Sequence, residues 1–225
     1  MPAQRIVVAI DGPSGVGKST VARLLARRLS LPFLDTGAMY RAIALKVLDS
    51  GVAPADRAAV ERLSAASSVG LSRRPDGSFE VLLDGEGVEN RIRTPAVGAA
   101  SSVVSAHPEV RKRLVSLQRD AARHFGGVLE GRDIGTRVFP ETPFKFFLDA
   151  RSEVRYQRRH AELQAAGREV SMEEVIQEID ERDHRDSTRE DSPLTRDPSY
   201  TFVDASDLTV EEVVERMARA IEGQR

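Results

Sequence analysis

The sequence predicts an α/β fold with a doubly wound parallel sheet, and three observations support it. Short apolar runs of strand character alternate along the chain with helical patterns. The first run, residues 6–10, is apolar at every position, which is typical of a parallel strand covered on both faces. A glycine-rich turn follows this run and leads into a helical pattern from Ser19 onward.

The other elements follow in chain order from changes in hydrophobic period. After Ser19, apolar residues recur at the spacing of one helix face, at Val21, Leu24, Leu25 and Leu29. Further strands are expected at residues 31–34, 128–129, 144–148 and 202–203, and further helices over residues 38–49 and after Pro108, Ser171 and Thr209.

Three of these helices have recognisable starts. Pro108 suits the first turn of a helix, where its missing N–H costs nothing. Ser171 with Glu174, and Thr209 with Glu212, have the spacing of a capping box. Each box opens an amphipathic run, so we expect a helix after each.

Residues 69–93 break the α/β pattern. Turn signals occur at residues 75–77 and 84–85, and apolar residues largely alternate with polar ones between them. This predicts a small antiparallel meander inserted into the α/β frame. Its boundaries are expected at residues 65–68 and 95–100.

Composition excludes several classes of protein. The 225 residues are 40% hydrophobic and carry a formal net charge of −2, which argues against binding nucleic acid by general phosphate neutralisation. No apolar run approaches the length of a membrane span, and the start of the chain lacks the apolar segment of a signal peptide. Cysteine is absent and the four histidines are scattered, so no Cys or His metal site is expected. We expect a cytoplasmic protein.

Arginine greatly outnumbers lysine among the basic residues. Of the 33 Lys and Arg residues, only four are Lys. An arginine excess suits phosphate binding, because the guanidinium group grips two phosphate oxygens at once. A GC-rich genome explains the same excess, so individual arginines need separate arguments.

The sharpest motif is Gly12-Pro13-Ser14-Gly15-Val16-Gly17-Lys18-Ser19. It fits the P-loop pattern and lies between a predicted strand and a predicted helix. Its backbone N–H groups and the helix N-terminus cradle phosphate oxygens. Lys18 would reach the β- and γ-phosphates, and Ser19 would be a ligand of Mg²⁺. The motif predicts a nucleoside triphosphate site.

Other features narrow the kind of P-loop protein. The only Asn is Asn90, so the Asn-Lys-x-Asp motif of GTPases is missing. Motor and helicase ATPases are usually longer. A small P-loop domain rich in arginine therefore favours a kinase that acts on a small molecule.

Two further motifs follow predicted strands, at the sheet edge where ligands bind. In the first, Thr36 and Gly37 would open a helix able to hold a second phosphate, with Arg41 one turn on. The alternative is that Thr36 is only a helix N-cap. In the second, Arg132 suits an anion and Asp133 an amine donor, and the alternative is a surface ion pair of little energetic value.

Two sets of arginines lie on predicted helices. Arg155, Arg158 and Arg159 share one helix face, and Arg182, Arg185 and Arg189 recur around Asp186. The alternative here is a solvated, salt-bridged helix pair, in which Glu178 pairs with Arg182 and Glu181 with Arg185.

These motifs together resemble those of the bacterial cytidylate kinase family. The matching segments are IDGPSGVGKST (10–20), LDTGAMYR (34–41), EGRDIGTRVFP (130–140), KFFLDA (145–150) and ERDHRDSTR (181–189). A P-loop alone is common to very many proteins, whereas this combination with a small β insert is specific. The resemblance spans nearly the whole chain.

The resemblance implies the P-loop nucleoside monophosphate kinase fold. That fold has a five-stranded parallel sheet with helices on both faces, a small antiparallel β insert and a short lid. Residues 1–64 and 101–225 would form the kinase core, with a lid over about 151–170, and residues 65–100 the NMP-binding insert. The implied reaction is in-line transfer from ATP to CMP or dCMP, with Mg²⁺, in a monomer that binds neither nucleic acid nor membrane.

The resemblance also implies roles for individual residues. ATP would be bound by Gly12, Pro13, Ser14, Gly15, Val16, Gly17, Lys18, Ser19 and Thr20, together with Arg155, Arg158 and Arg159 of the lid. The acceptor phosphate would be held by Thr36, Gly37, Arg41, Arg132 and Arg189, and the cytosine would face Ser101, Arg111 and Asp133. Asp186 would bind the sugar hydroxyls, and the catalytic residues would be Lys18, Arg132, Arg182 and Arg189. The family often has Ser where this chain has Thr36, which preserves the hydroxyl.

The resemblance leaves some points open. Asp133 and Asp149 are both candidates for a second Mg²⁺ carboxylate, and the metal is also expected to be held largely through water. No general base is required, because the attacking phosphate, with a second pKa of about 6, is already largely ionised at neutral pH. Two other hypotheses stay open: a P-loop kinase for a different small acceptor, and a nucleotide-sensing module without turnover.

Overall fold

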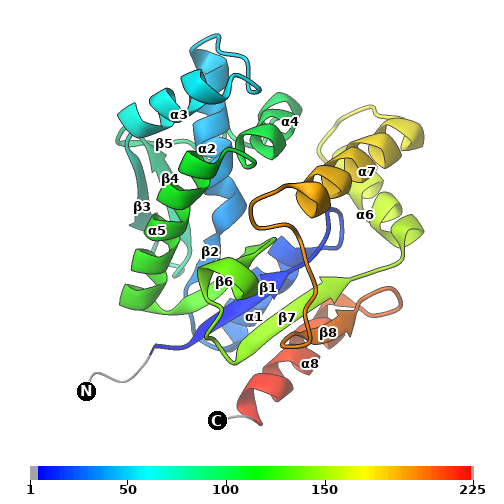
Figure 1. Ribbon diagram of the computed structural model, residues 1–225. Coiled ribbons are helices and arrows are strands. Elements are labelled where there is room, and N and C mark those ends of the chain that lie inside the picture. Colours follow the sequence, from blue (N-terminus) through cyan, green and yellow to red (C-terminus); the bar gives the residue numbers. More distant parts are fainter. Residues whose placement is uncertain (1–4, 224–225) are drawn as a thin grey trace.

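A five-stranded parallel sheet forms the centre of the computed structural model, which describes residues 5–223 (Figure 1). Its spatial order is β2 (Phe33–Asp35), β6 (Gly127–Gly131), β1 (Val7–Asp11), β7 (Phe144–Asp149) and β8 (Thr201–Asp204), with every neighbouring pair parallel. The five predicted strands and the doubly wound α/β class are confirmed. Because all five strands run the same way, their carboxyl ends meet along one edge of the sheet.

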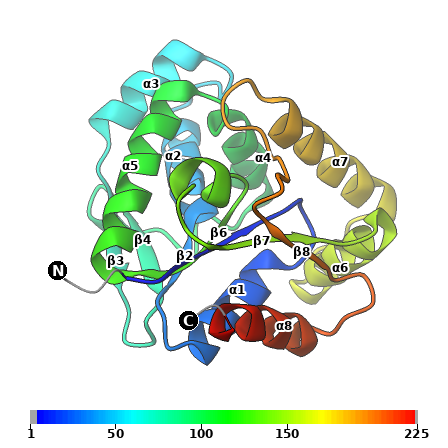
Figure 2. The same cartoon turned by 60° about the horizontal axis from the view of Figure 1, so that its bottom comes forward.

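Helices cover both faces of this sheet, as Figure 2 shows. Helices α1 (Lys18–Arg28) and α8 (Val210–Glu222) lie together on one face, and α2 (Thr36–Asp49) and α5 (Pro108–Phe125) lie on the other. Ile10 and Leu148 of the central strands are fully buried against Leu25 of α1 and Met217 of α8. The continuous apolar runs in these strands are explained by burial on both faces.

The predicted meander is confirmed as a three-stranded antiparallel sheet. It consists of β3 (Val69–Arg73), β4 (Phe79–Leu83) and β5 (Glu86–Gly87). Helices α3 (Arg57–Ala66) and α4 (Pro95–Val104) flank it in the chain. The inward-facing Val81 and Leu83 belong to the same buried cluster as Ile43 of α2 and Leu114 of α5. The insert therefore shares its hydrophobic core with α2 and α5.

Helices α6 (Ser152–Ala165) and α7 (Met172–Thr188) form a hairpin on the side of the molecule opposite the insert (Figure 1). Leu163, Val175 and Ile179 make a small hydrophobic cluster between the two helices. The capping boxes predicted at Ser171 and Thr209 are both present, and each begins its helix at the expected residue. Within residues 5–223, no helix is both long and apolar enough to cross a membrane.

Three elements were not predicted: helices α3 and α4, and a π-helical turn, η1 (Ile134–Val138), directly after Asp133. The buried carboxylate of Asp11, at the end of β1, accepts the backbone N–H groups of Ile134 at 2.9 Å and Gly135 at 2.8 Å. The turn is thus held in place by a strand that is far away in the sequence.

Candidate active site

The P-loop lies at the carboxyl edge of the sheet, where residues 12–17 connect β1 to α1. Gly12 has a φ of 153°, and a Cβ there would lie 2.0 Å from the carbonyl oxygen of Leu148. Gly15 has a φ of 74°, and a Cβ there would lie 2.9 Å from the carbonyl oxygen of Arg155. Only glycine fits at these two positions. The loop is therefore packed between β7 and the start of α6.

Lys18 is buried at the start of α1, and its ammonium group donates to the carbonyl of Pro13. Burial lowers its pKa well below the ordinary value, and the nearby Arg132 and Arg182 lower it further. The carboxylates of Glu130 and Asp183 oppose this shift. Ser19 and Thr20, which follow Lys18, are exposed.

Glu130, at the end of β6, faces Lys18 and Ser19. It is buried, and its Oε1 atom has no hydrogen-bond partner among the described residues. Burial raises its pKa to about 7, and the negative charge of Asp35 contributes to the shift, while Lys18 and a hydrogen bond from Ser19 oppose it. Glu130 belongs to the motif EGRDIGTRVFP, but it was assigned no role from the sequence. Its position directly after a predicted strand, at the sheet edge where ligands bind, could have identified it as a site residue.

The start of α2 adjoins this carboxylate. The Thr36 hydroxyl donates to the carbonyl of Glu130 at 2.7 Å, and Asp35 caps the helix by accepting the N–H of Ala38 at 3.0 Å. The alternative that Thr36 serves only as the N-cap is wrong, because Asp35 holds that position. Gly37 occupies the first turn of the helix, as predicted.

Arg41 lies one turn further along α2 and donates to the carbonyl of Ile92 at 3.2 Å. Burial lowers its pKa, and the neighbouring Arg93 and Arg132 contribute, while Asp35 opposes the shift. Arg93 was not identified from the sequence. It contacts Asp35 at 2.8 Å and Glu89 at 2.6 Å, and so joins the start of α2 to the segment that follows the insert.

Arg132 links the P-loop to α7. Its guanidinium contacts Asp186 at 2.7 Å and donates to the hydroxyl of Ser14 at 3.0 Å. Its sequence neighbour Asp133 pairs with Arg111 and lies 3.6 Å from Arg189. The alternative of a surface Arg132–Asp133 ion pair is wrong, because Asp133 is buried and both side chains are paired elsewhere.

A cluster of buried polar side chains surrounds Asp133. Arg111 is 2% exposed, donates to the carbonyl of Ser105 at 3.3 Å and lies over the ring of Tyr40. Ser101 is buried one turn before Ser105 on α4. The structure thus brings Arg111, Asp133 and Arg189 into contact. Ser101 is linked to this cluster through Ser105, the residue that ends its helix and accepts from Arg111.

Five buried guanidinium nitrogens have no hydrogen-bond partner among the described residues: Arg111 Nε, Arg113 Nη1, Arg155 Nε, Arg182 Nε and Arg189 Nη2. Arg182 and Arg189 flank Asp186, at 3.9 Å and 4.0 Å. Burial lowers the pKa of Arg182 to about 10, and Arg132 adds to the shift. Burial acts to raise the pKa of Asp186, but Arg132, Arg182 and Arg189 outweigh it and leave the pKa lowered. Unsatisfied cationic donors of this kind suit an anionic ligand.

The predicted lid arginines take different places. Arg155 donates to the carbonyl of Ser14 at 2.9 Å, and Arg158 donates to that of Val16 at 3.3 Å. Arg159 turns to α7 and contacts Glu178 at 3.2 Å.

The alternative of a solvated, salt-bridged helix pair holds only in part. Of the two predicted ion pairs, Glu181–Arg185 is present at 3.6 Å. Glu178 does not pair with Arg182 and instead pairs with Arg159 of α6.

The two carboxylates left open as metal ligands are both engaged. Asp133 is taken by Arg111 and Arg189, and Asp149 accepts the N–H of Ala150 at 2.8 Å. Within residues 5–223, no three His, Cys, Asp or Glu side chains gather in a way that suits a metal ion.

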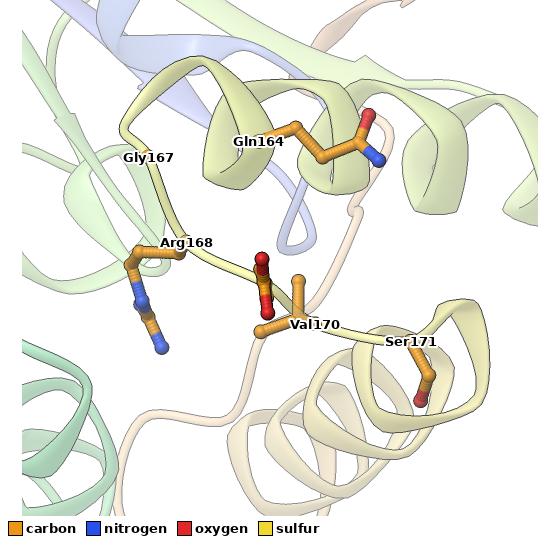
Figure 3. Close-up of a pocket in the computed structure, with 6 residues that line it drawn as sticks. Gln164, Gly167, Arg168, Val170 and Ser171 are labelled. Carbon is orange, nitrogen blue, oxygen red and sulfur yellow. The ribbon is translucent and has the colours of Figure 1, made fainter.

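A separate hollow of about 630 Å³ lies at the turn between α6 and α7 (Figure 3). Gln164, Gly167, Arg168, Glu169, Val170 and Ser171 line it. None of these residues belongs to the charged site described above.

The family model and the curated relatives that match this chain carry the same description. The family model described as "Cytidylate kinase" matches residues 8–223. A cytidylate kinase of Pelotomaculum thermopropionicum is 48% identical over 97% of this chain and 97% of its own. One from Corynebacterium glutamicum is 49% identical over 99% of this chain and 96% of its own.

Solved structures agree on the fold. An uncharacterized protein of Eubacterium ventriosum superposes with a TM-score of 0.57 at 14% identity, over 98% of this chain and 99% of that one. At this identity the similarity concerns the fold alone.

Proposed function

The chain belongs to the cytidylate kinase family, and on that premise we propose that it transfers the γ-phosphoryl group of ATP in line to CMP and dCMP. It is a nucleoside monophosphate kinase enzyme. The observation that carries the finer proposal is a set of buried guanidinium nitrogens, those of Arg111, Arg182 and Arg189, which make no hydrogen bond and lie 3.6–3.9 Å from the nearest carboxylate. Two phosphate-bearing ligands placed end to end would meet at this set.

The donor nucleotide would lie on the P-loop. The backbone N–H groups of residues 14–19 and the start of α1 would hold its phosphates, and Lys18 would neutralise the charge that develops during transfer. Arg155 and Arg158 contact the loop from α6, so we assign them to the same nucleotide. Their approach to the loop supports a lid over residues 151–170.

The acceptor phosphate would lie between α2 and α7. Thr36 and Gly37 open α2, Arg41 follows one turn later, and Arg132 and Arg189 reach the same region through Asp186. Arg182 would stabilise the transferring group, since its Nε makes no hydrogen bond and its neighbour Arg132 reaches the P-loop. This arrangement supplies alignment and positive charge, the two requirements of phosphoryl transfer.

The cytosine would lie against Asp133, Arg111 and Ser101. A carboxylate accepts from the amino group of cytosine, and the guanidinium and hydroxyl donate to its ring acceptors. Asp186 is tied to three arginines, so its proposed contact with the sugar hydroxyls would be made from a fixed position. Insert residues 65–100 would cover the acceptor side, since they share a core with α2.

The residues near Ser19 fit Mg²⁺. Oxygen donors are what this ion prefers, and the structure supplies the Ser19 hydroxyl and the unpartnered Oε1 of Glu130. Burial and the negative charge of Asp35 raise the pKa of Glu130, and a bound cation would favour the charged form of this carboxylate. When bound, the ion would neutralise the phosphate oxygens of ATP. Ser19 would ligate it, and the carboxylates would hold its water shell.

An acceptor panel tests the proposal. ATP and Mg²⁺ are supplied with CMP, dCMP, UMP, AMP or a hydroxy acid, and ADP release is measured with a coupled assay. We expect turnover with CMP and dCMP far above the other acceptors. Preference for another acceptor would contradict the assignment of the base pocket. ATP binding without turnover of any acceptor would instead favour a nucleotide-sensing module.

A further inference from the structure

A carboxylate from α7 lies at the mouth of the P-loop. Oδ1 of Asp183 accepts the backbone N–H of Ser14 at 2.8 Å, although the two residues are 169 positions apart. Its other oxygen, Oδ2, pairs with the guanidinium of Arg155. Arg155 also donates to the Ser14 carbonyl, so the three residues close a ring of contacts between α7, α6 and the loop.

Positive charge surrounds Asp183. Besides Arg155, the cations that feel its charge are Lys18, Arg132 and Arg182. A backbone N–H of a P-loop and several cationic side chains are the groups that bind a phosphate. The Asp183 carboxylate therefore occupies a position whose surroundings have the chemistry of a phosphate subsite.

We propose that Asp183 takes the place of the γ-phosphate of ATP at Ser14 and Arg155, and that a triphosphate must displace it to bind fully. The inference rests on the proposed function, because it takes ATP as the donor. Two anions in contact at a half-buried site repel strongly, so Asp183 and a γ-phosphate do not share the Ser14 N–H. Displacement frees Arg155 to face the phosphate.

This competition distinguishes ATP from ADP. The amides of a P-loop cradle the α- and β-phosphates, which both nucleotides possess, and here these would be the amides next to α1, from Gly15 to Ser19. Ser14 lies further from the helix, so ADP leaves its contact with Asp183 intact. Asp183 thus weakens the binding of ATP relative to ADP until α7 moves, and it returns to Ser14 once the γ-phosphoryl group has left.

The test compares nucleotide binding by calorimetry, without acceptor, in the wild type and Asp183→Asn. Asparagine keeps the shape and an oxygen for the Ser14 N–H but removes the charge. We expect ATP to bind about tenfold more tightly, by removal of a charge repulsion. The dissociation constant of ADP is expected to change by less than about twofold.

Asp180→Asn is the matched control. Asp180 lies one turn earlier on α7 and accepts from the Tyr156 hydroxyl at 2.6 Å, away from the P-loop. The control removes the same charge from the same helix and is expected to leave both affinities unchanged. Weaker ATP binding in Asp183→Asn, or equal changes for ATP and ADP, would show that Asp183 only braces Arg155 and would overturn the inference.

Asp183→Ser provides a second neutral variant if the asparagine variant fails to fold, with the same expected change in the ATP-to-ADP ratio. Activity of the wild type and the nucleotide affinities of the variants distinguish failure of the proposed function from failure of this inference. A wild-type chain that turns over no acceptor contradicts the proposed function. An active wild type with an unchanged ratio in the neutral variants contradicts this inference alone.

Discussion

The phenol of Tyr200 donates a hydrogen bond to Oδ2 of Asp11 at 2.7 Å, across 189 residues of sequence. Asp11 ends β1 and immediately precedes the P-loop, and the same carboxylate accepts two N–H groups of η1, next to Asp133. Tyr200 directly precedes β8, at the end of the segment that leads from Arg189. One buried carboxylate thus connects the P-loop, the turn that follows Asp133 and the segment after α7.

Removing that phenol is expected to destabilise the fold. In Tyr200→Phe, Asp11 keeps its backbone partners but loses a hydrogen bond to a buried acidic group. We expect the free energy of unfolding to fall by about 1–2 kcal/mol in denaturant titrations. Tyr156→Phe is the control, because the phenol of Tyr156 donates to Asp180 at the surface. Its removal is expected to lower the free energy of unfolding by less than about 0.5 kcal/mol. Equal losses of unfolding free energy in the two variants would contradict a larger contribution from the buried hydrogen bond.

Asp11 also predicts a pH dependence of stability. Burial raises its pKa from 3.8 to about 6 in the folded protein. Its contribution to stability is therefore full below about pH 3.8 and is lost as the pH rises through about 6. Asp11→Asn removes this titration. The stability difference between the wild type and this variant is expected to shrink by about 1 kcal/mol from pH 5 to pH 7. A difference that does not vary with pH would contradict the raised pKa.

Lys18→Ala is expected to abolish most phosphoryl transfer without unfolding the protein. Loss of a charge that acts on the transition state typically lowers the rate ~10²–10³-fold. The measurement is kcat with CMP, with circular dichroism to establish the fold. Lys112→Ala is the control, since Lys112 is 78% exposed in its side chain on α5. Turnover close to wild type in Lys18→Ala would remove the P-loop from the mechanism.

Arg41→Ala is expected to weaken CMP binding by about 10–100-fold, because a charge-assisted contact with phosphate is lost. ATP binding is expected to stay within about twofold, since the P-loop does not use Arg41. Calorimetry with each nucleotide alone separates the two effects. Arg57→Ala on α3 removes an exposed arginine paired with Glu61 and serves as the control. A larger loss for ATP than for CMP would place Arg41 in the donor half of the site.

Asp133→Asn is expected to narrow the preference for CMP over UMP. Asparagine offers either an oxygen or an amide N–H to the base, so the ratio of kcat/KM for CMP and UMP should fall at least about tenfold. Asp191→Asn is the control, because Asp191 lies 3.8 Å from the same Arg111 but is partly exposed. If CMP and UMP suffer equally in Asp133→Asn, the carboxylate only supports Arg111 and Arg189.

Local patterns in the sequence predicted the frame of the molecule well. The five strands, the meander and the two capping boxes depend on hydrophobic period and on residues within one turn of each other, and all of them are present. The π-helical turn was missed because its cause, the carboxylate of Asp11, lies more than 120 residues earlier.

The site was predicted less completely for the same physical reason. Motifs identified Arg132 and Asp133, but their partners Asp186 and Arg111 come from other elements of the fold. Glu178 illustrates the limit: the i, i+4 rule pairs it with Arg182, whereas Arg159 from the facing helix takes it. A helix-surface pair is worth only a few tenths of a kcal/mol, so a tertiary contact easily replaces it.

The crowding of buried arginines also links the stability of the protein to its metabolites. Each buried guanidinium nitrogen left without a hydrogen bond makes the folded state less favourable than full hydrogen bonding would. A nucleotide that binds only the folded chain stabilises it by about 2.7 kcal/mol at a hundred times its dissociation constant. The resistance of this protein to heat and proteolysis should therefore rise and fall with the cellular supply of nucleotides.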